Sequence, residues 1–205
     1  LGALMGICFA GNLVTLYLFY ELMTLCSIPL VLHIGTRKAF EAAYRYLAFS
    51  VAGAGLGLLG LFVLQGYCTT DLFTPGGVLD GALASGDRQW LLCVFLVMAV
   101  GFGCKAGMFP LHAWLPIAHP VAPAPASAVL SGVITKTGIY GVAVLSTTLF
   151  LHDGSWGAML AAIGAVTMVL GAVFLAKTTG TLSKLTAVAT AMEIPELSMV
   201  RILLG

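Results

Sequence analysis

Long hydrophobic runs separated by short polar stretches dominate the pattern of this chain. A membrane-spanning helix needs about 20 consecutive, mostly apolar residues, and five of the runs are long enough. The pattern predicts a helical stub at residues 1–10 and spans at 13–33, 42–67, 90–118, 125–151 and 156–176. In residues 177–205 charged residues and a proline interrupt the pattern, so no full span is placed in this tail.

Composition supports a membrane protein. Of 205 residues, 60% are hydrophobic and only 8% charged, whereas a soluble domain has about 25% charged residues. The chain therefore has room for about five to seven transmembrane helices, which predicts an all-α polytopic protein of the cytoplasmic or inner membrane. Residues 1–205 would form a single transmembrane domain. Because the chain begins inside a predicted helix without an initiator methionine, we expect it to be a fragment.

The same composition excludes several kinds of site. A net charge of +1 gives no reason to expect a nucleic-acid partner. The five cysteines form no C-x-x-C pair and have no histidine spacing suited to zinc. No nucleotide loop, haem ligand pair or catalytic triad is recognisable, so we expect no metal, no cofactor, no catalytic residue and no redox centre.

The predicted loops differ in charge on the two sides of the membrane. One side carries five basic residues: Arg37, Lys38, Arg45, Lys177 and Lys184. The other side carries Arg88 as its one basic residue and four acidic residues: Asp71, Asp80, Asp87 and Asp153. Because basic loops stay in the cytoplasm, the span at 13–33 is predicted to run from outside to inside.

Lys105 lies in a predicted span that proline interrupts. Pro110 has no N–H, and its ring collides with the carbonyl of residue 106, so we expect a helix break there. Broken helices at membrane depth occur where they are buried in protein or line a hydrated cavity. The lysine beside such a break indicates an ion pathway. The alternative is that Lys105 extends its ammonium to the headgroups.

Two further charged residues lie near the middle of predicted spans. Glu21 is eight residues into its span, and Lys136 is eleven residues from Pro125 and fifteen from Leu151. A lysine at bilayer depth costs roughly 2.5 kcal/mol or more, and such charges usually face a partner or a cavity. Both residues are therefore candidates for a proton pathway. For Glu21, a hydrogen bond to a neighbouring helix is the alternative.

Two histidines and an arginine are additional candidates. His112 and His119 follow the proline and are seven residues apart, roughly on one helical face. Histidine titrates near physiological pH, which suits a proton relay, although a histidine that caps a helix end would look the same. Arg45 lies near the predicted cytoplasmic interface, where it either anchors the helix or extends a chain of charges.

At these residues the chain resembles the antiporter-like subunits of respiratory complex I, of multisubunit cation/proton antiporters and of membrane-bound hydrogenases. The resemblance is carried by KAGMFPLHAWLPIAHPVAPAPASAVLSGVITKTGIYG, which starts at Lys105, and by YELMTL around Glu21. It implies that Glu21 is the essential carboxylate, Lys105 the broken-helix lysine and Lys136 the central lysine. Arg45 stands where the family often has lysine. The resemblance also implies two inverted repeats, of which this chain holds roughly one.

The resemblance implies a proton-translocating subunit of a complex I-like NADH:quinone oxidoreductase or a group-4 hydrogenase of the formate hydrogenlyase or hydrogenase-4 type. Redox reactions in other membrane and peripheral subunits would supply the energy, so whether the assembly counts as an enzyme depends on those partners. The ion is H⁺ or Na⁺. The alternatives are a subunit of a multisubunit Na⁺/H⁺ antiporter and a non-conducting scaffold subunit.

Overall fold

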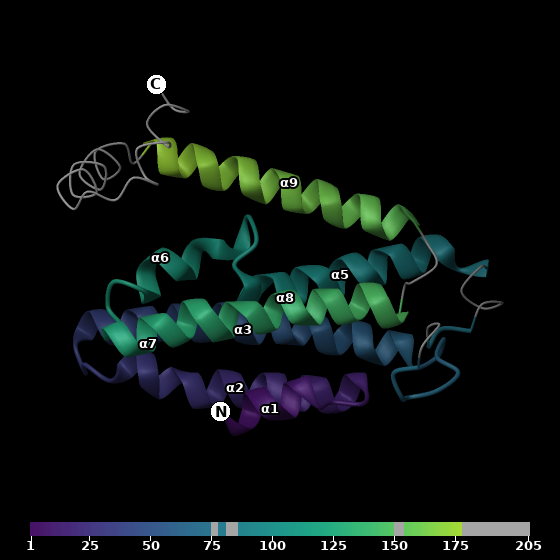
Figure 1. The fold of residues 1–205 in the computed structure, drawn as a ribbon, viewed down its shortest axis with the longest axis horizontal. Coiled ribbons are helices and arrows are strands. Elements are labelled where there is room, and N and C mark those ends of the chain that lie inside the picture. Colours follow the sequence, from purple (N-terminus) through teal and green to yellow (C-terminus); the bar gives the residue numbers. More distant parts are fainter. Residues whose placement is uncertain (75–77, 81–85, 150–153, 178–205) are drawn as a thin grey trace, which may run out of the picture. The chain divides into compact units, whose positions relative to one another are not determined.

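The computed structural model describes residues 1–74, 78–80, 86–149 and 154–177 (Figure 1). In these residues all regular secondary structure is helical, apart from the isolated β-bridges Asn12–Leu72 and Cys68–Leu79. The chain divides into two compact units, residues 1–161 and 162–205. The predicted tail at 178–205 lies outside the described residues.

The described residues of the first half of the chain form one short and three long helices. They are α1 (Gly2–Cys8), α2 (Leu13–Leu32), α3 (Arg37–Leu64) and α5 (Arg88–Ala106). A broken connection follows, made of the 3₁₀ turn η1 (Leu111–Trp114) and the short helix α6 (Leu115–Ala118). The chain then continues through α7 (Ala124–Val129), the π-helical turn η2 (Leu130–Ile134), α8 (Thr135–Val144), the π-helical turn η3 (Leu145–Leu149) and α9 (Gly154–Lys177).

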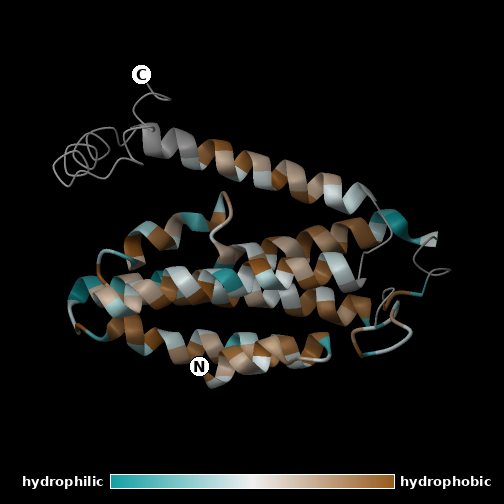
Figure 2. Cartoon of the chain, viewed as in Figure 1, coloured by the Kyte–Doolittle hydropathy of each residue, from teal (hydrophilic) through white to brown (hydrophobic). Residues whose placement is uncertain are grey.

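Five stretches of the described chain are long and apolar enough to cross a membrane. They are Leu13–Leu32, Arg37–Leu64, Arg88–Ala118, Ala124–Thr147 and Gly154–Gly171. Many of their large apolar side chains are exposed, for example Leu18 at 62% and Phe62 at 64%. Hydrophobic residues cover the helices, and hydrophilic residues gather mainly near the helix ends (Figure 2). Exposed apolar surface of this extent fits lipid, which confirms the predicted all-α membrane protein.

Neighbouring helices of the first unit pack closely against one another. In the first unit α1 packs on α2, α2 on α3, α3 on α5 and α5 on α8 (Figure 1). Gly53 and Gly101 make the α3–α5 contact: a Cβ on either glycine would lie 2.6 Å from the carbonyl oxygen of the other. Small residues allow such close approach between membrane helices. The crossing therefore depends on glycine at both positions.

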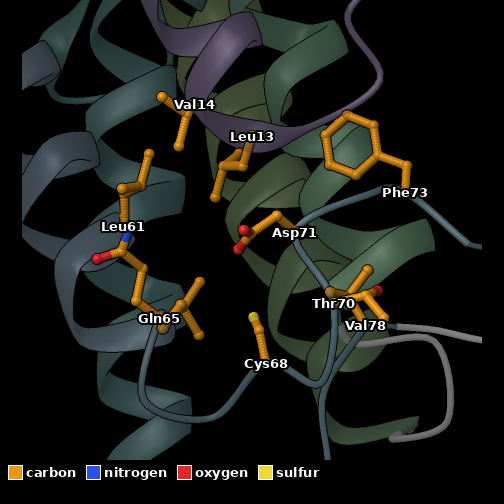
Figure 3. Close-up of a pocket in the computed structure, with 10 residues that line it drawn as sticks. Leu13, Val14, Leu61, Gln65, Cys68, Thr70, Asp71, Phe73 and Val78 are labelled. Atoms are coloured by element: carbon orange, nitrogen blue, oxygen red, sulfur yellow. The ribbon is translucent and has the colours of Figure 1, made fainter.

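The described part of the connection between α3 and α5, which includes residues 65–74 and 78–80, contacts the chain at the beginning of α2. Phe73 N–H donates to the Gly11 carbonyl at 2.8 Å, and Asp80 N–H donates to the Tyr67 carbonyl at 2.8 Å. Beneath this connection lies a small cavity of about 40 Å³, lined by apolar side chains of α2 and α3 and by the polar Gln65 and Asp71 (Figure 3). The cavity is thus at the end of the first unit that the charge pattern predicts to be acidic and external.

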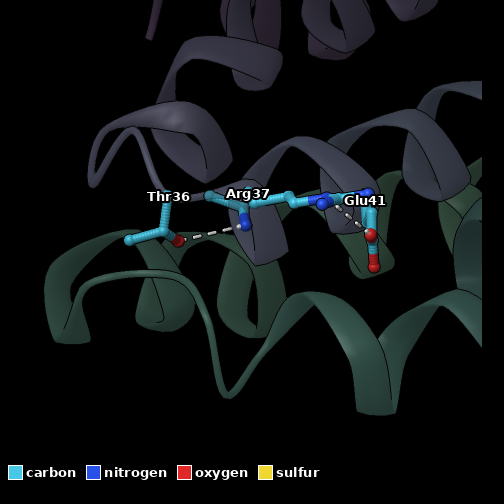
Figure 4. Close-up of polar contacts among 4 residues, drawn as sticks. Thr36, Arg37 and Glu41 are labelled. Carbon is cyan, nitrogen blue, oxygen red and sulfur yellow. Dashed lines mark hydrogen bonds and ion pairs between the residues drawn. The ribbon is translucent and has the colours of Figure 1, made fainter.

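At the opposite end of the first unit, a helix cap and an exposed ion pair stabilise the beginning of α3. The Thr36 hydroxyl caps the helix by accepting a hydrogen bond from Ala39 N–H at 3.2 Å. Arg37 and Glu41 form an exposed ion pair with 3.9 Å between Nε and Oε1 (Figure 4). An exposed pair of this kind contributes about 0.3–0.5 kcal/mol. The predicted cytoplasmic loop is therefore held mainly by its helix cap.

Candidate functional site

Lys105 lies in the interior of the first unit, with a side chain that is 1% exposed. It belongs to the last turn of α5, which ends at Ala106. The carbonyl groups of a helix C-terminus favour a nearby positive charge. The side chain is therefore buried among helices, and the alternative in which its ammonium reaches the headgroups is not what the structure has.

The Lys105 ammonium binds α2 through uncharged groups. Nζ donates to the Tyr20 carbonyl at 3.0 Å and to the Thr24 hydroxyl. It also lies 3.4 Å from the centroid of the Tyr20 ring, a cation–π geometry that is strengthened by burial. These contacts place the ammonium on the turn of α2 that contains Glu21.

Glu21 lies beside this cluster without closing an ion pair. Glu21 and Lys105 form no ion pair within 4 Å in the described structure. Glu21 is half-buried, and its Oε1 is buried with no hydrogen-bond partner in the described chain. A buried carboxylate oxygen without a partner costs free energy. A buried polar atom without a partner in a folded protein requires an explanation, and a functional role is one such explanation.

The break after α5 is built by a glycine and a tryptophan as well as by Pro110. Gly107 has φ +75°, a left-handed conformation that glycine adopts without strain, and it ends α5 three residues before the proline. Trp114 then turns back, and its Nε1–H donates to the Cys104 carbonyl at 2.8 Å. The indole thus satisfies a backbone acceptor next to Lys105 that the end of the helix leaves free.

Hydroxyl and aromatic groups connect this break to α2. The Trp114 ring packs on Tyr46 of α3, with centroids 4.9 Å apart. The hydroxyls of Tyr46 and Ser27 are 2.6 Å apart, and Ser27 also donates to the Thr24 carbonyl at 2.8 Å. Because Ser27 uses its proton for that carbonyl, the phenol of Tyr46 is the donor to Ser27. A continuous set of contacts therefore links η1, α3 and the Lys105 acceptors.

The two histidines have separate partners. His112 lies in η1 and stacks on Phe109, with ring centroids 5.8 Å apart. His119 follows α6, and its Nδ1 lies 2.7 Å from the Ser127 hydroxyl of α7. The segment between the histidines changes from a 3₁₀ turn to an α-helix, so they are not on a single regular helix face.

Lys136 and Arg45 are both exposed in this chain. Lys136 is the second residue of α8, and its neighbours Thr135 and Thr137 are buried and bond to backbone carbonyls. Arg45 lies in the third turn of α3, beside the buried Tyr46. The structure therefore assembles Glu21, Lys105 and the proline break, and it leaves Lys136 and Arg45 outside the contacts of Lys105.

Three residues in this cluster were not singled out from the sequence: Tyr20, Thr24 and Trp114. Residues three or four apart share a helix face, so Thr24, three residues after Glu21, could have been found from that spacing. Trp114 is part of the H-x-W motif, but nothing in the pattern assigns its indole a backbone acceptor. Among the described residues, no group of three histidine, cysteine or acidic side chains could hold a metal ion.

Comparisons with known proteins identify the family of this chain. The family model described as NADH:quinone oxidoreductase/Mrp antiporter, transmembrane, matches residues 10–190. An uncharacterized protein of Mycobacterium tuberculosis (strain ATCC 25618 / H37Rv) is 38% identical over 185 residues, which are 88% of this chain and 27% of that protein. Hydrogenase-4 component B of Escherichia coli (strain K12) is 37% identical over 161 residues, 76% of this chain and 27% of that protein.

A solved structure shares the fold. A chain of the Mrp complex from Dietzia sp. DQ12-45-1b has a TM-score of 0.63 at 22% identity, and the match covers 72% of this chain and 28% of that one. The chain thus spans roughly a quarter of the length of these similar proteins. Because the family model matches most of its residues, this chain belongs to the NADH:quinone oxidoreductase/Mrp antiporter family of multi-pass membrane proteins.

Proposed function

We propose that this chain is part of a proton-translocating subunit of a redox-driven membrane complex, either complex I-like or a group-4 hydrogenase. Glu21 and Lys105 would form the pair whose separation drives the proton, and Lys136 would pass it on along the membrane plane. His112, His119 and Arg45 are further candidates for the path. Other subunits would carry the redox centres and supply the energy.

One observation carries this proposal: a fully buried ammonium that only uncharged groups hold, one helical turn from a carboxylate. Lys105 binds the Tyr20 carbonyl and the Thr24 hydroxyl, and Glu21 keeps a buried oxygen without a partner. A lysine buried purely for structure is expected to be paired directly, because an unpaired buried charge is costly. The arrangement favours a residue that changes its charge during function.

Proton transfer through this site follows from the chemistry of the two side chains. Lys105 must be neutral for part of the cycle, since it accepts a proton and then releases it. Glu21 stabilises the ammonium electrostatically when the two approach, and its withdrawal favours release of the proton. The 37% identity to hydrogenase-4 component B supports a hydrogenase-type complex. The second candidate, a Na⁺/H⁺ antiporter subunit, is supported by the antiporter part of the family description.

The test measures proton pumping per electron in membrane vesicles that carry the complete protein with its partner subunits. Glu21→Gln and Lys105→Ala should each abolish most pumping while the complex still assembles. Lys105→Arg should fail as well, because a guanidinium does not lose its proton in a protein. Lys38→Ala and Lys38→Arg are matched controls, since Lys38 is exposed in the first turn of α3, and they should pump normally.

The outcomes separate the alternatives. Normal pumping by Lys105→Arg in a fully assembled complex would refute deprotonation of Lys105 and leave it a packing or anchoring residue. Normal pumping by Glu21→Gln, Lys105→Ala and Lys105→Arg would point to a scaffold subunit. Pumping that requires Na⁺ and is accompanied by ²²Na⁺ movement would identify the antiporter alternative.

A further inference from the structure

Thr24 is the one side chain that shares a hydrogen bond with Lys105 in the described structure. It lies on α2, it is 1% exposed, and its hydroxyl accepts from the ammonium. The same hydroxyl donates to the Tyr20 carbonyl of its own helix at 3.2 Å. Its single proton is therefore directed at the backbone, which leaves a lone pair on Oγ1 for the lysine.

The three contacts of Lys105 respond differently to loss of its proton. The Tyr20 carbonyl can only accept a hydrogen bond, and the Tyr20 ring attracts a cation rather than a neutral amine. A hydroxyl can accept or donate. Rotation about the Cβ–Oγ1 bond moves its proton from the Tyr20 carbonyl to the lone pair of a neutral Lys105 amine.

We infer that Thr24 is the positioning residue that holds Lys105 at this point of α2 in both of its protonation states. When Lys105 is charged, the Thr24 hydroxyl accepts from the ammonium and donates to the Tyr20 carbonyl. When Lys105 is neutral, the hydroxyl donates to the amine. The lysine thus keeps a defined place beside Glu21 during transfer, although Thr24 itself carries no proton away. This inference rests on the proposed function, because it assumes that Lys105 becomes neutral.

The surroundings of Thr24 support a role that depends on the hydroxyl. The titratable groups near this region are Tyr17, Tyr20 and Glu21 on α2, Tyr46 on α3, and Cys104 and Lys105 on α5. The Ser27 hydroxyl donates to the Thr24 carbonyl, and the Tyr46 hydroxyl bonds to Ser27. Neither of these hydroxyls is bonded to the Thr24 side chain. Within the described structure, the Thr24 hydroxyl is therefore the side-chain donor placed to serve the Lys105 amine.

The experiment compares Thr24→Val with Thr24→Ser in the intact complex, with pumping per electron as the measurement. Valine keeps the shape and removes the hydroxyl, so pumping should fall about tenfold or more, as expected when a charge-assisted hydrogen bond is lost. Serine keeps the hydroxyl and should pump within about twofold of the original protein. Thr167→Val is the matched control, because the Thr167 hydroxyl on α9 also donates to a carbonyl four residues earlier, that of Ile163 at 2.8 Å.

Each result decides the inference. Normal pumping by Thr24→Val overturns it, and so does an equal loss in Thr24→Val and Thr24→Ser, which would mean that the methyl group and packing matter. If Thr24→Val does not assemble, Thr24→Ala replaces it and is judged against Thr24→Ser in the same way. Lys105→Ala is measured in parallel: if it pumps normally, the proposed function fails together with this inference. If Lys105→Ala is inactive and Thr24→Val is normal, only the role of Thr24 is wrong.

Discussion

Replacement of Gly138 by alanine should disturb the contact between α8 and the end of α5. A Cβ at Gly138 would lie 2.7 Å from the Phe102 carbonyl oxygen and 2.9 Å from the Ala106 Cα. Ordinary contact begins at 3.4 Å, and the Ala106 nitrogen would be nearer than either of these atoms, so α8 must retreat from α5 by more than about 0.7 Å. The atoms in the way belong to the backbone of α5, and rotation of a side chain cannot relieve the clash.

Two effects should follow from this displacement. Overpacking of an interior contact costs about 1–3 kcal/mol, so the free energy of unfolding should fall by that amount. The clash falls on Ala106 of α5, which directly follows Lys105. Because a misplacement of about 1 Å can lower a reaction rate roughly 100-fold, proton pumping should fall more steeply than stability.

Gly132→Ala provides the matched control for Gly138→Ala. It makes the same change in the continuous helical run that contains α8, and a Cβ there would meet no atom within 4 Å. Thermal unfolding of the purified protein in detergent measures stability, and vesicles measure pumping. Equal stability and equal pumping of Gly138→Ala and Gly132→Ala would refute the argument, because the helices could then accept a methyl group without moving.

Two further predictions concern the helix break and the topology. Trp114→Phe removes the donor to the Cys104 carbonyl and leaves that acceptor buried, so it should cost about 1–3 kcal/mol of stability. Trp90→Phe, at a side chain that is 53% exposed, should cost less than about 0.5 kcal/mol, and equal thermal shifts of the two variants would contradict the role of the indole. In a cysteine-free variant, single cysteines at Arg37 and Asp80 should react with impermeant thiol reagents from opposite sides of the membrane, Arg37 from the cytoplasm. Labelling of both from one side would require a different number of spans between them.

The general position of Lys105 could be predicted from the sequence, and the end of its helix could not. Length and hydropathy place the lysine in a span, and the proline predicts a kink or break nearby. From the sequence, both Gly107 and Pro110 are candidates for the end of α5. A glycine ends a helix when its backbone adopts a left-handed conformation, and the residue pattern does not show whether it does so. The structure has this conformation at Gly107, so the break begins before the proline.

The direction of Lys136 could not be predicted for a different reason. In water, the polar face of a helix is exposed and its apolar face is buried, so periodicity identifies both. In a membrane the outside is apolar as well, and the exposed Ile139 and Tyr140 of α8 are no less hydrophobic than its buried Gly138 and Gly141. The depth of Lys136 was predictable from its distance to the helix ends, but the face on which it lies depends on packing against α5.

The contacts of Lys105 suggest why its ammonium binds neutral groups although a carboxylate is near. A direct ion pair in a medium of low dielectric constant is strong, and a lysine held in this way would give up its proton reluctantly. The Tyr20 carbonyl and the Thr24 hydroxyl hold the ammonium on the same helix as Glu21 with less electrostatic energy. Side chains three residues apart on a helix have Cβ atoms about 5–6 Å apart, so Glu21 is a near neighbour of Thr24 on α2. Under the proposed function, Lys105 keeps its neutral contacts in both protonation states, and the Glu21 carboxylate favours the charged form through space.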